Sequence, residues 1–192
     1  RDEAKITPAM HGTFVHKVME LIPLKEETQE KDVEEFLASL VEKNILTQQE
    51  AATVSVRQIA SFFRSELGRR ACRAHWVKRE WPFTLRRSRR ELAVMAKDRE
   101  TAEMLRRELP SELLIQGIID CCFGDEHGIV VVDYKTDYID FKNKKASFDE
   151  IRRRYEKQVA LYRDVIRIAF DTDRIEAKLF LFRASEAIDI PL

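Results

Sequence analysis

The chain has 192 residues, of which 44% are hydrophobic, and its 34 basic residues balance its 34 acidic residues. This length suffices for one sizeable core, so a single domain over 1–192 is predicted. No run approaches the roughly 18 apolar residues of a membrane span, and no signal peptide opens the chain. The absence of such segments from the sequence argues against a membrane protein and favours a soluble, cytoplasmic one.

The cysteine count further limits the class. Cys72, Cys121 and Cys122 make no paired disulfide framework and no C-x-x-C motif. We therefore expect reduced thiols and no four-thiolate iron–sulfur cluster. The opening Arg1-Asp2-Glu3 is no natural initiation. The domain is expected to have been excised from a longer chain.

Residues 1–75 are predicted to form a helical section. Apolar residues at helical spacing predict helices over Thr13–Leu21 and Val33–Val41. Residues 47–50 (T-Q-Q-E) and 55–58 (S-V-R-Q) are capping-box patterns, and the second predicts a helix that ends near Gly68. His16 lies on the first helix, where a lone histidine is more often structural than a ligand.

A basic strip follows the helical section. Between Arg69 and Arg90 nine basic residues stand against one acid, Glu80, a net charge of +8 over 22 residues. Such a strip could bind phosphates, and the interleaved Trp76, Trp81 and Phe83 could stack on bases. The alternative is a solvated face beside an ordinary aromatic core, and packing is the more common role of such tryptophans. The basic residues are Arg69, Arg70, Arg73, Lys78, Arg79, Arg86, Arg87, Arg89 and Arg90.

The C-terminal part, residues 76–192, is predicted to be the α/β core. A strand over 76–86 is expected to be broken by Pro82, and a helix is predicted over 98–109. Later elements include a hairpin over 113–135, a helix opened by Ser147-x-x-Glu150 and running to about 170, and a buried strand over 175–182. This order predicts a three-layer α/β fold with a mixed central sheet. A second basic cluster (Lys142, Lys144, Lys145, Arg152, Arg153 and Arg154) follows the hairpin.

The hairpin carries the residues that indicate chemistry. With its turn near Glu126, Asp120 falls opposite Val132 or Asp133, and Lys135 shares the face of Asp133. Two neighbouring carboxylates repel each other unless a cation lies between them. Oxygen ligands favour Mg²⁺ or Mn²⁺, and a nearby lysine could orient water or stabilise a phosphoryl oxygen. The alternative is a hairpin with a surface salt bridge, because D-(x)n-D-x-K is a loose pattern.

Four motifs in order make a more specific pattern. G-T-F-V-H at 12–16, G-I-I-D at 117–120, D-Y-K-T-D at 133–137 and Q-V-A-L-Y at 158–162 resemble the RecB-type branch of the PD-(D/E)XK nucleases. The likeness is to the C-terminal nuclease domain of helicase–nuclease proteins of the AddA type, and it covers nearly the whole chain. It implies a restriction-endonuclease-like fold and an Mg²⁺-dependent deoxyribonuclease.

The resemblance also implies roles for individual residues. His16, Asp120, Asp133 and the carbonyl of Tyr134 match the family's metal ligands, and Lys135 its catalytic lysine. Glu80 resembles an acid on a preceding strand that could hold a second metal, orient water or serve the fold. Gln158 and Tyr162 match a Q-x-x-x-Y motif that contacts DNA or supports the site, with helix packing as the alternative. The family's proline is replaced by Ile119, and its middle acid is Asp133, as is common in this branch.

The expected substrate is single-stranded DNA, cut by an exonuclease within an ATP-dependent helicase–nuclease that processes double-strand breaks for recombinational repair. The expected partners are helicase domains of the parent chain and a second helicase–nuclease protein of the AddB type, with no membrane. Two other functions stay open. One is a pseudo-nuclease that binds DNA or a scaffold without cutting, and the other is a phosphohydrolase acting on small nucleotides, although two basic clusters favour a polymer.

Overall fold

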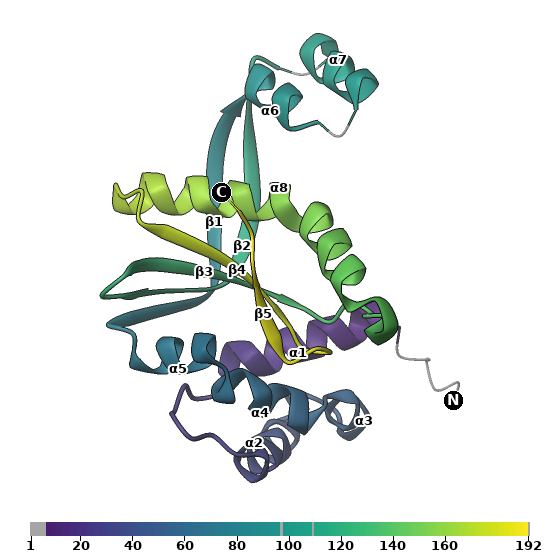
Figure 1. Ribbon diagram of the computed structural model, residues 1–192, viewed down its shortest axis with the longest axis vertical. Coiled ribbons are helices and arrows are strands. Elements are labelled where there is room, and N and C mark those ends of the chain that lie inside the picture. Colours follow the sequence, from purple (N-terminus) through teal and green to yellow (C-terminus); the bar gives the residue numbers. More distant parts are fainter. Residues whose placement is uncertain (1–6, 97, 109, 192) are drawn as a thin grey trace.

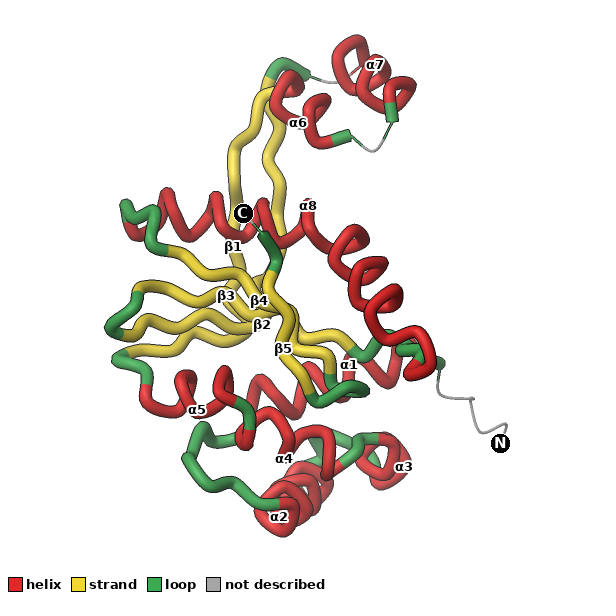
Figure 2. Tube along the Cα trace, in the orientation of Figure 1, coloured by secondary structure: helices red, strands yellow, loops and turns green. Residues whose placement is uncertain are grey.

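A computed structural model describes residues 7–96, 98–108 and 110–191. A five-stranded sheet lies between helices on its two faces (Figure 1, Figure 2). This confirms the predicted α/β class with a mixed central sheet. The strands are β1 (Trp76–Ser88), β2 (Glu112–Asp125), β3 (Gly128–Lys135), β4 (Ile175–Leu181) and β5 (Glu186–Asp189). The helices are α1 (Pro8–Leu21), α2 (Glu30–Glu42), α3 (Gln48–Thr53), α4 (Val56–Arg64), α5 (Glu66–Arg73), α6 (Arg89–Met95), α7 (Arg99–Glu108) and α8 (Lys144–Phe170), with a 3-10 turn, η1 (Phe141–Asn143).

The sheet has the strand order β1-β2-β3-β4-β5. Neighbouring strands are antiparallel except β3 and β4, which are parallel and are joined by the crossover helix α8. The strand predicted over 175–182 therefore lies beside the hairpin, as β4. A further short strand, β5, was not predicted, because four residues of mixed polarity give no periodic pattern.

The sheet divides at its centre. Pairing of β2 with β3 runs from Asp125↔Gly128 to Cys121↔Val132 and goes no further. Pairing of β2 with β1 continues past that point to Ser88↔Glu112. The β1–β2 ribbon, which we call the arm (residues 81–119), thus leaves the body of the sheet and carries α6 and α7 at its tip (Figure 1).

Each sheet face has its own apolar core. Helices α1 to α5 cover one face, where Val18, Phe62 and Tyr134 are buried together. Helix α8 covers the other, where Ile119, Val131 and Ile166 are buried (Figure 2). The two cores hold α1 and α8 on opposite sides of the place where β2 and β3 separate.

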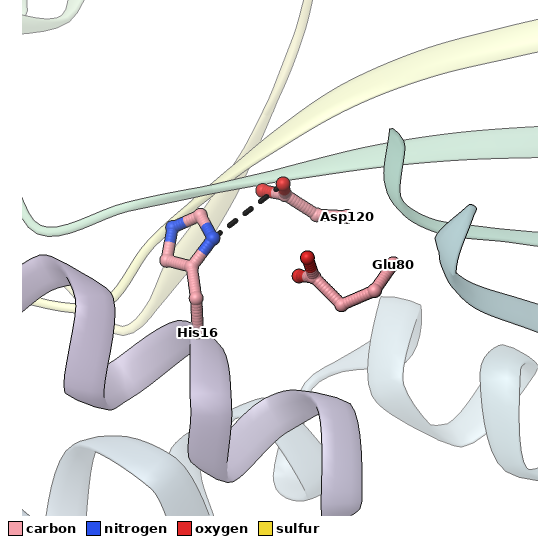
Figure 3. A group of neighbouring side chains, drawn as sticks. All are labelled: His16, Glu80 and Asp120. Atoms are coloured by element: carbon pink, nitrogen blue, oxygen red, sulfur yellow. Dashed lines mark ion pairs between the residues drawn. The ribbon is translucent and has the colours of Figure 1, made fainter. Parts of the chain in front are cut away.

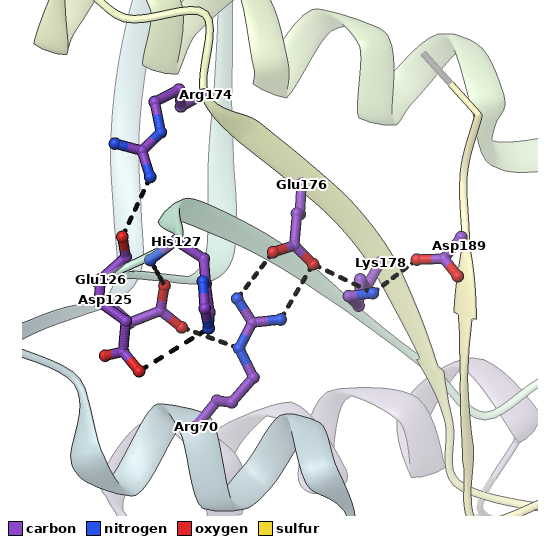
Figure 4. Close-up of polar contacts among 8 residues, drawn as sticks. All are labelled: Arg70, Asp125, Glu126, His127, Arg174, Glu176, Lys178 and Asp189. Carbon is purple, nitrogen blue, oxygen red and sulfur yellow. Dashed lines mark hydrogen bonds and ion pairs between the residues drawn. The ribbon is translucent and has the colours of Figure 1, made fainter.

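A network of charged side chains links α5 to the end of the sheet that carries the β2–β3 turn (Figure 4). The Arg70 guanidinium donates to Asp125 at 2.8 Å and to both carboxylate oxygens of Glu176, at 2.7 and 3.0 Å. Lys178 continues the network to Glu176 at 3.2 Å and Asp189 at 2.6 Å. Helix α5, strand β4 and the hairpin turn are fastened together by these contacts.

The N-terminal helices differ from prediction at their ends. The first helix begins at Pro8, with Thr7 as its N-cap, so the predicted start at Thr13 was five residues late. The helix predicted from Val56 to Gly68 is two helices, because Ser65 ends α4 and caps α5 through a bond from the Gly68 amide. Gly68 lies inside α5, where a Cβ would come within 1.9 Å of the Phe62 carbonyl oxygen.

Strand β1 is unbroken at Pro82, contrary to prediction. It is an edge strand, where a residue without an N–H is tolerated, and Pro82 pairs with Ile118. The irregularity falls at Glu80 instead, whose φ of 47° lies in the left-handed region. That conformation is costly for a non-glycine residue and is typical of functional sites.

Three further boundaries were predicted incompletely. Helix α6 was missed, although Ser88 and Glu91 form a capping box at its start. The next helix ends at Glu108, and Leu109, at the predicted end, lies outside the described residues. Helix α8 begins at Lys144, so Ser147 is not its cap, and the Ser147 hydroxyl instead accepts from the Asp140 amide.

Three arginines of the basic strip of residues 69–90 are engaged inside the protein. Arg70 and Arg87 form ion pairs in which the arginine side chain is at most 20% exposed, and Arg79 donates to the carbonyls of Met19 and Ile22. Trp76 stacks on Phe170 with ring centroids 4.9 Å apart, so its role is packing. The strip therefore does not form one continuous free phosphate-binding surface.

None of the helices that the structure describes is long and apolar enough to cross a membrane.

Candidate active site

The side chains predicted to carry chemistry gather where β2 leaves β3. Continuing the register of the two strands places Asp120 opposite Asp133, one of the two predicted pairings. Asp120 Oδ2 accepts a 2.7 Å hydrogen bond from the Tyr134 amide. A side chain thus replaces the ladder bond that a neighbouring strand would supply, and it fixes the carboxylate at the point of divergence.

Helix α1 delivers His16 to this point. Phe14, Val15, Val18 and Met19 of the same helix are buried in the core, which fixes the side from which His16 reaches the sheet. His16 Nδ1 lies 3.5 Å from Asp120 Oδ1, and Nε2 lies 3.0 Å from the Tyr134 carbonyl oxygen. The structure therefore brings together three of the four groups that the resemblance implies as metal ligands.

Glu80 completes a cluster with His16 and Asp120. One ligand atom from each of the three residues lies within 4.8 Å of the others (Figure 3). Figure 3 shows the Glu80 carboxylate directed toward the space between the imidazole and Asp120. The left-handed φ of Glu80 contributes to this placement, so the backbone cost coincides with the cluster.

Asp133 and Lys135 form a pair beside that cluster. Lys135 Nζ lies 2.8 Å from Asp133 Oδ2, which confirms that the two side chains share a face. Lys135 Nζ also lies 4.1 Å from the centroid of the Tyr155 ring, a cation–π contact with α8. The ammonium is thus held between a carboxylate and an aromatic ring, with 12% of its side chain exposed.

The acids outnumber the cations, and their pKa values reflect this. Burial, and next the charge of Asp120, raise the pKa of Asp133. Burial and then Asp120 likewise raise the pKa of Glu80. Burial would also raise the pKa of Asp120, but the hydrogen bond and charge of His16, together with the bonds from the Tyr134 amide and Asp133, outweigh it and hold that pKa below its ordinary value. Burial lowers the pKa of His16, but the hydrogen bond and charge of Asp120, together with the Tyr134 carbonyl and the charge of Asp133, outweigh that effect and raise it.

These donors fit a hard divalent cation. Two carboxylates converge with one imidazole, and a third carboxylate and a backbone carbonyl lie beside them, a set dominated by oxygen. The raised pKa values of Asp133 and Glu80 mean that the protein alone does not balance the negative charge of their ionised carboxylates. A cation at this point would supply the missing positive charge.

Gln158 and Tyr162 lie on α8 and bond to each other. Gln158 Nε2 donates to the Tyr162 hydroxyl oxygen at 2.6 Å. The Tyr162 ring is buried against Phe83, with centroids 5.8 Å apart, and burial followed by the charge of Asp133 raises the pKa of its hydroxyl. This placement favours support of the site over direct contact with DNA, and the role stays a prediction.

Tyr155, which lies near the site, was not among the predicted site residues. Tyr155 lies under Lys135 and bonds to Asp137, whose carboxylate also accepts from Arg154 at 2.6 Å. Tyr155 precedes Gln158 and Tyr162 by three and seven positions, so one helical face carries all three. That spacing could have indicated Tyr155.

Comparison with known proteins decides the family. A model of the PD-(D/E)XK nuclease superfamily matches residues 1–189. The chain belongs to the PD-(D/E)XK nuclease superfamily. Asp120, Asp133 and Lys135 lie together at the division of the sheet.

Relatives in this nuclease superfamily are named as ATP-dependent helicase/nuclease subunits. The protein of that name from Clostridium botulinum (strain Loch Maree / Type A3) is 32% identical over 189 residues, which cover 98% of this chain and 14% of the relative. That from Anoxybacillus flavithermus (strain DSM 21510 / WK1) is 33% identical over 178 residues, covering 92% of this chain and 13% of the relative. The chain thus spans about one seventh of the length of these relatives.

Proposed function

We propose that this chain is the DNA-cleaving domain of a helicase–nuclease and hydrolyses phosphodiester bonds with Mg²⁺, or Mn²⁺ as a substitute. One observation carries the proposal. His16, Glu80 and Asp120 converge within 4.8 Å beside the Asp133–Lys135 pair, at the only place in the described residues where three such ligands meet. The superfamily match supports the same function.

The proposed ligands are His16, Asp120, Asp133 and the carbonyl of Tyr134, with Glu80 as a further ligand or a group that orients water. When bound, the cation lowers the pKa of water and neutralises charge on a phosphoryl oxygen. His16 is held ready by its contacts with Asp120 and the Tyr134 carbonyl. The chain therefore presents its donors in advance.

Lys135 is the proposed catalytic lysine. Its ammonium lies 2.8 Å from Asp133 Oδ2 and rests on the Tyr155 ring, beside the proposed metal ligands. A positive group that meets developing negative charge stabilises the transition state more than the ground state. Loss of Lys135 should therefore lower the rate and leave the fold intact.

The proposed substrate is single-stranded DNA. The relatives are named for both helicase and nuclease, and a helicase in a longer parent chain would deliver unwound strands to this domain. We place residues 1–192 as a single nuclease domain of such a chain, with residues 1–75 supplying His16. A partner protein of the AddB type, and a role in processing double-strand breaks for recombinational repair in the bacterial cytoplasm, complete the proposal.

A non-catalytic DNA-binding module is the alternative from another class. It predicts binding without cleavage in any metal, and the complete set of Asp120, Asp133 and Lys135 weighs against it. A phosphohydrolase acting on small nucleotides is a second alternative. Competition by mononucleotides would then match competition by oligonucleotides.

The test is cleavage of an end-labelled single-stranded oligonucleotide by wild type and Asp133→Ala, in Mg²⁺, Ca²⁺ or EDTA. We expect cleavage by wild type in Mg²⁺ alone, and retained DNA binding by the variant. Equal cleavage in EDTA, or by Asp133→Ala, would reject the proposed metal chemistry. Binding without cleavage by wild type would favour the non-catalytic alternative.

A further inference from the structure

A second hollow opens directly beside the catalytic pocket. The catalytic pocket is lined in part by His16, Glu80 and Lys135, and its lining also includes Thr136 and Asp137. The same two residues line the second hollow, whose other walls come from the first turns of α1, the end of α3 and the turn between β4 and β5. We call it the flanking pocket; its lining is Thr7, Pro8, His11, Thr53, Thr136, Asp137, Tyr138 and Arg183. A chain lying in the catalytic pocket would pass into it over Thr136.

The flanking pocket presents an aromatic ring with no intramolecular partner ring. Tyr138 is 77% exposed, the second most exposed of the large hydrophobic side chains described. No ring or cation in the described part of the chain packs on it, whereas Tyr155 lies under Lys135 and Tyr162 lies against Phe83. An exposed face of this kind can stack on an unpaired base.

The same pocket presents an arginine without a carboxylate. Arg183 Nε donates to the Thr136 carbonyl oxygen at 3.2 Å, which fixes the guanidinium at the rim. Among the described residues no acid pairs with it, and the neighbouring Asp137 is already paired with Arg154. Other arginines, such as Arg70 and Arg87, are neutralised by acids. The Arg183 charge is therefore available for a phosphate.

We propose that the flanking pocket holds the nucleotide next to the scissile phosphate, with its base stacked on Tyr138 and its phosphate against Arg183. This inference rests on the proposed function and deepens it, because it names the residues that would hold one unpaired nucleotide of the substrate. A base within a duplex has both faces covered by its neighbours and cannot stack on Tyr138. The pocket would therefore select an unpaired nucleotide.

The expected effect follows from known stacking energies. Removing an aromatic ring from such a site costs about 1–3 kcal/mol per base, which corresponds to about a 5- to 150-fold loss of affinity. Removing one phosphate-contacting cation lowers the slope of log K against log salt by about one. The two residues thus give separate signals in one binding experiment.

The first experiment measures binding of the 192-residue chain to a fluorescent oligothymidylate in Ca²⁺. We expect Tyr138→Ala to bind at least about fivefold more weakly, and Tyr138→Phe to bind as wild type does, because the ring does the stacking. Phe141→Ala is the matched control, since Phe141 is also exposed (64%) but does not line the pocket. We expect it to bind as wild type does.

An abasic scan then asks whether one base is responsible. The same oligonucleotide is made with a single abasic nucleotide at each position in turn. We expect one or two positions to weaken binding by wild type as much as Tyr138→Ala does, and to have no further effect on Tyr138→Ala. Arg183→Gln should lower the salt slope by about one, with Arg99→Gln on the distant α7 as the control.

Two outcomes overturn the inference. In the first, Tyr138→Ala binds the intact oligonucleotide as tightly as wild type does. In the second, the abasic positions weaken binding by wild type and by Tyr138→Ala equally. Mg²⁺-dependent cleavage is measured on the same preparations. If wild type cuts DNA but Tyr138→Ala binds as wild type does, the flanking-pocket proposal is rejected and the nuclease proposal stands. If wild type does not cut DNA but one or two abasic positions weaken its binding as expected, the flanking-pocket proposal stands and the nuclease proposal is rejected.

Discussion

Two regions of this molecule bury charged groups, and they treat them in opposite ways. At the network end of the sheet, Arg70 lies between Asp125 and Glu176, and Lys178 follows, so each carboxylate has a cation within about 3 Å (Figure 4). At the division of β2 and β3, the carboxylates of Glu80 and Asp120 lie beside His16 (Figure 3). Asp133 lies next to them, and Lys135 is the other cation there.

The pKa values follow that difference. The Arg70 hydrogen bond holds the pKa of Glu176 below its ordinary value, and at Asp125 the bonds and charges of Arg70 and His127 together outweigh burial and lower the pKa too. At the division of the sheet, burial and Asp120 raise the pKa of Asp133 and of Glu80. The network is balanced within the protein and stabilises the fold. The active site is left short of positive charge, which is the condition for recruiting a cation.

The largest expected effect is on catalysis. Lys135→Ala should lower the rate of Mg²⁺-dependent cleavage about 10²- to 10⁴-fold, because the positive group that meets the phosphoryl charge is lost. Single-turnover cleavage under saturating enzyme measures it, and Lys145→Ala, exposed on α8, is the control. Circular dichroism should show both variants folded. A Lys135→Ala protein that cuts at the wild-type rate would remove the lysine from the mechanism.

The next largest effect concerns the network and should spare catalysis. Arg70→Met should lower the free energy of unfolding by about 2 kcal/mol, because it leaves Asp125, only 7% exposed, without its cation. This is less than for a fully buried pair, since Glu176 is 39% exposed. Arg73→Met is the matched control, because Arg73 pairs with Glu26 at the surface and its loss should change little. Urea denaturation measures both.

The network should also respond to acid in a defined direction. Because the folded-state pKa values of Asp125 and Glu176 are lowered, their stabilisation is present above the ordinary carboxyl range of about 4 and is lost as the pH falls through the lowered values. The stability difference between wild type and Arg70→Met should therefore shrink below about pH 4. A difference that stays constant down to about pH 2.5 would contradict the coupling.

The smallest effect is a gain in stability at the active site. Glu80→Gln should raise the metal-free free energy of unfolding by less than about 1 kcal/mol, because it removes a carboxylate whose pKa is raised by burial and by Asp120. The same change should weaken Mg²⁺-dependent activity if Glu80 is a ligand or orients water. Thermal melts in EDTA measure the stability. A clear loss in EDTA would mean that the charge of Glu80 serves the fold.

The sequence was informative wherever a motif or a period was local. The hairpin and the shared face of Asp133 and Lys135 follow from period two and from turn residues, and the crossover helix follows from helical spacing and helix-start signals. The separation of β2 from β3 could not be predicted, because it depends on how the two apolar cores pack against the strands. The same limit applies to Glu80, whose position depends on a left-handed φ, and to Arg70, whose partners are 55 and 106 residues away.

The most direct test of a cation site at the division of the sheet is the melting temperature of wild type and Asp133→Asn, each in EDTA and in Mg²⁺. We predict that Mg²⁺ raises the melting temperature of wild type, because Mg²⁺ binds the folded chain and not the unfolded chain. Asp133→Asn should melt at or above wild type in EDTA and should gain little from Mg²⁺. A wild type indifferent to Mg²⁺, or an equal gain in Asp133→Asn, would contradict the account.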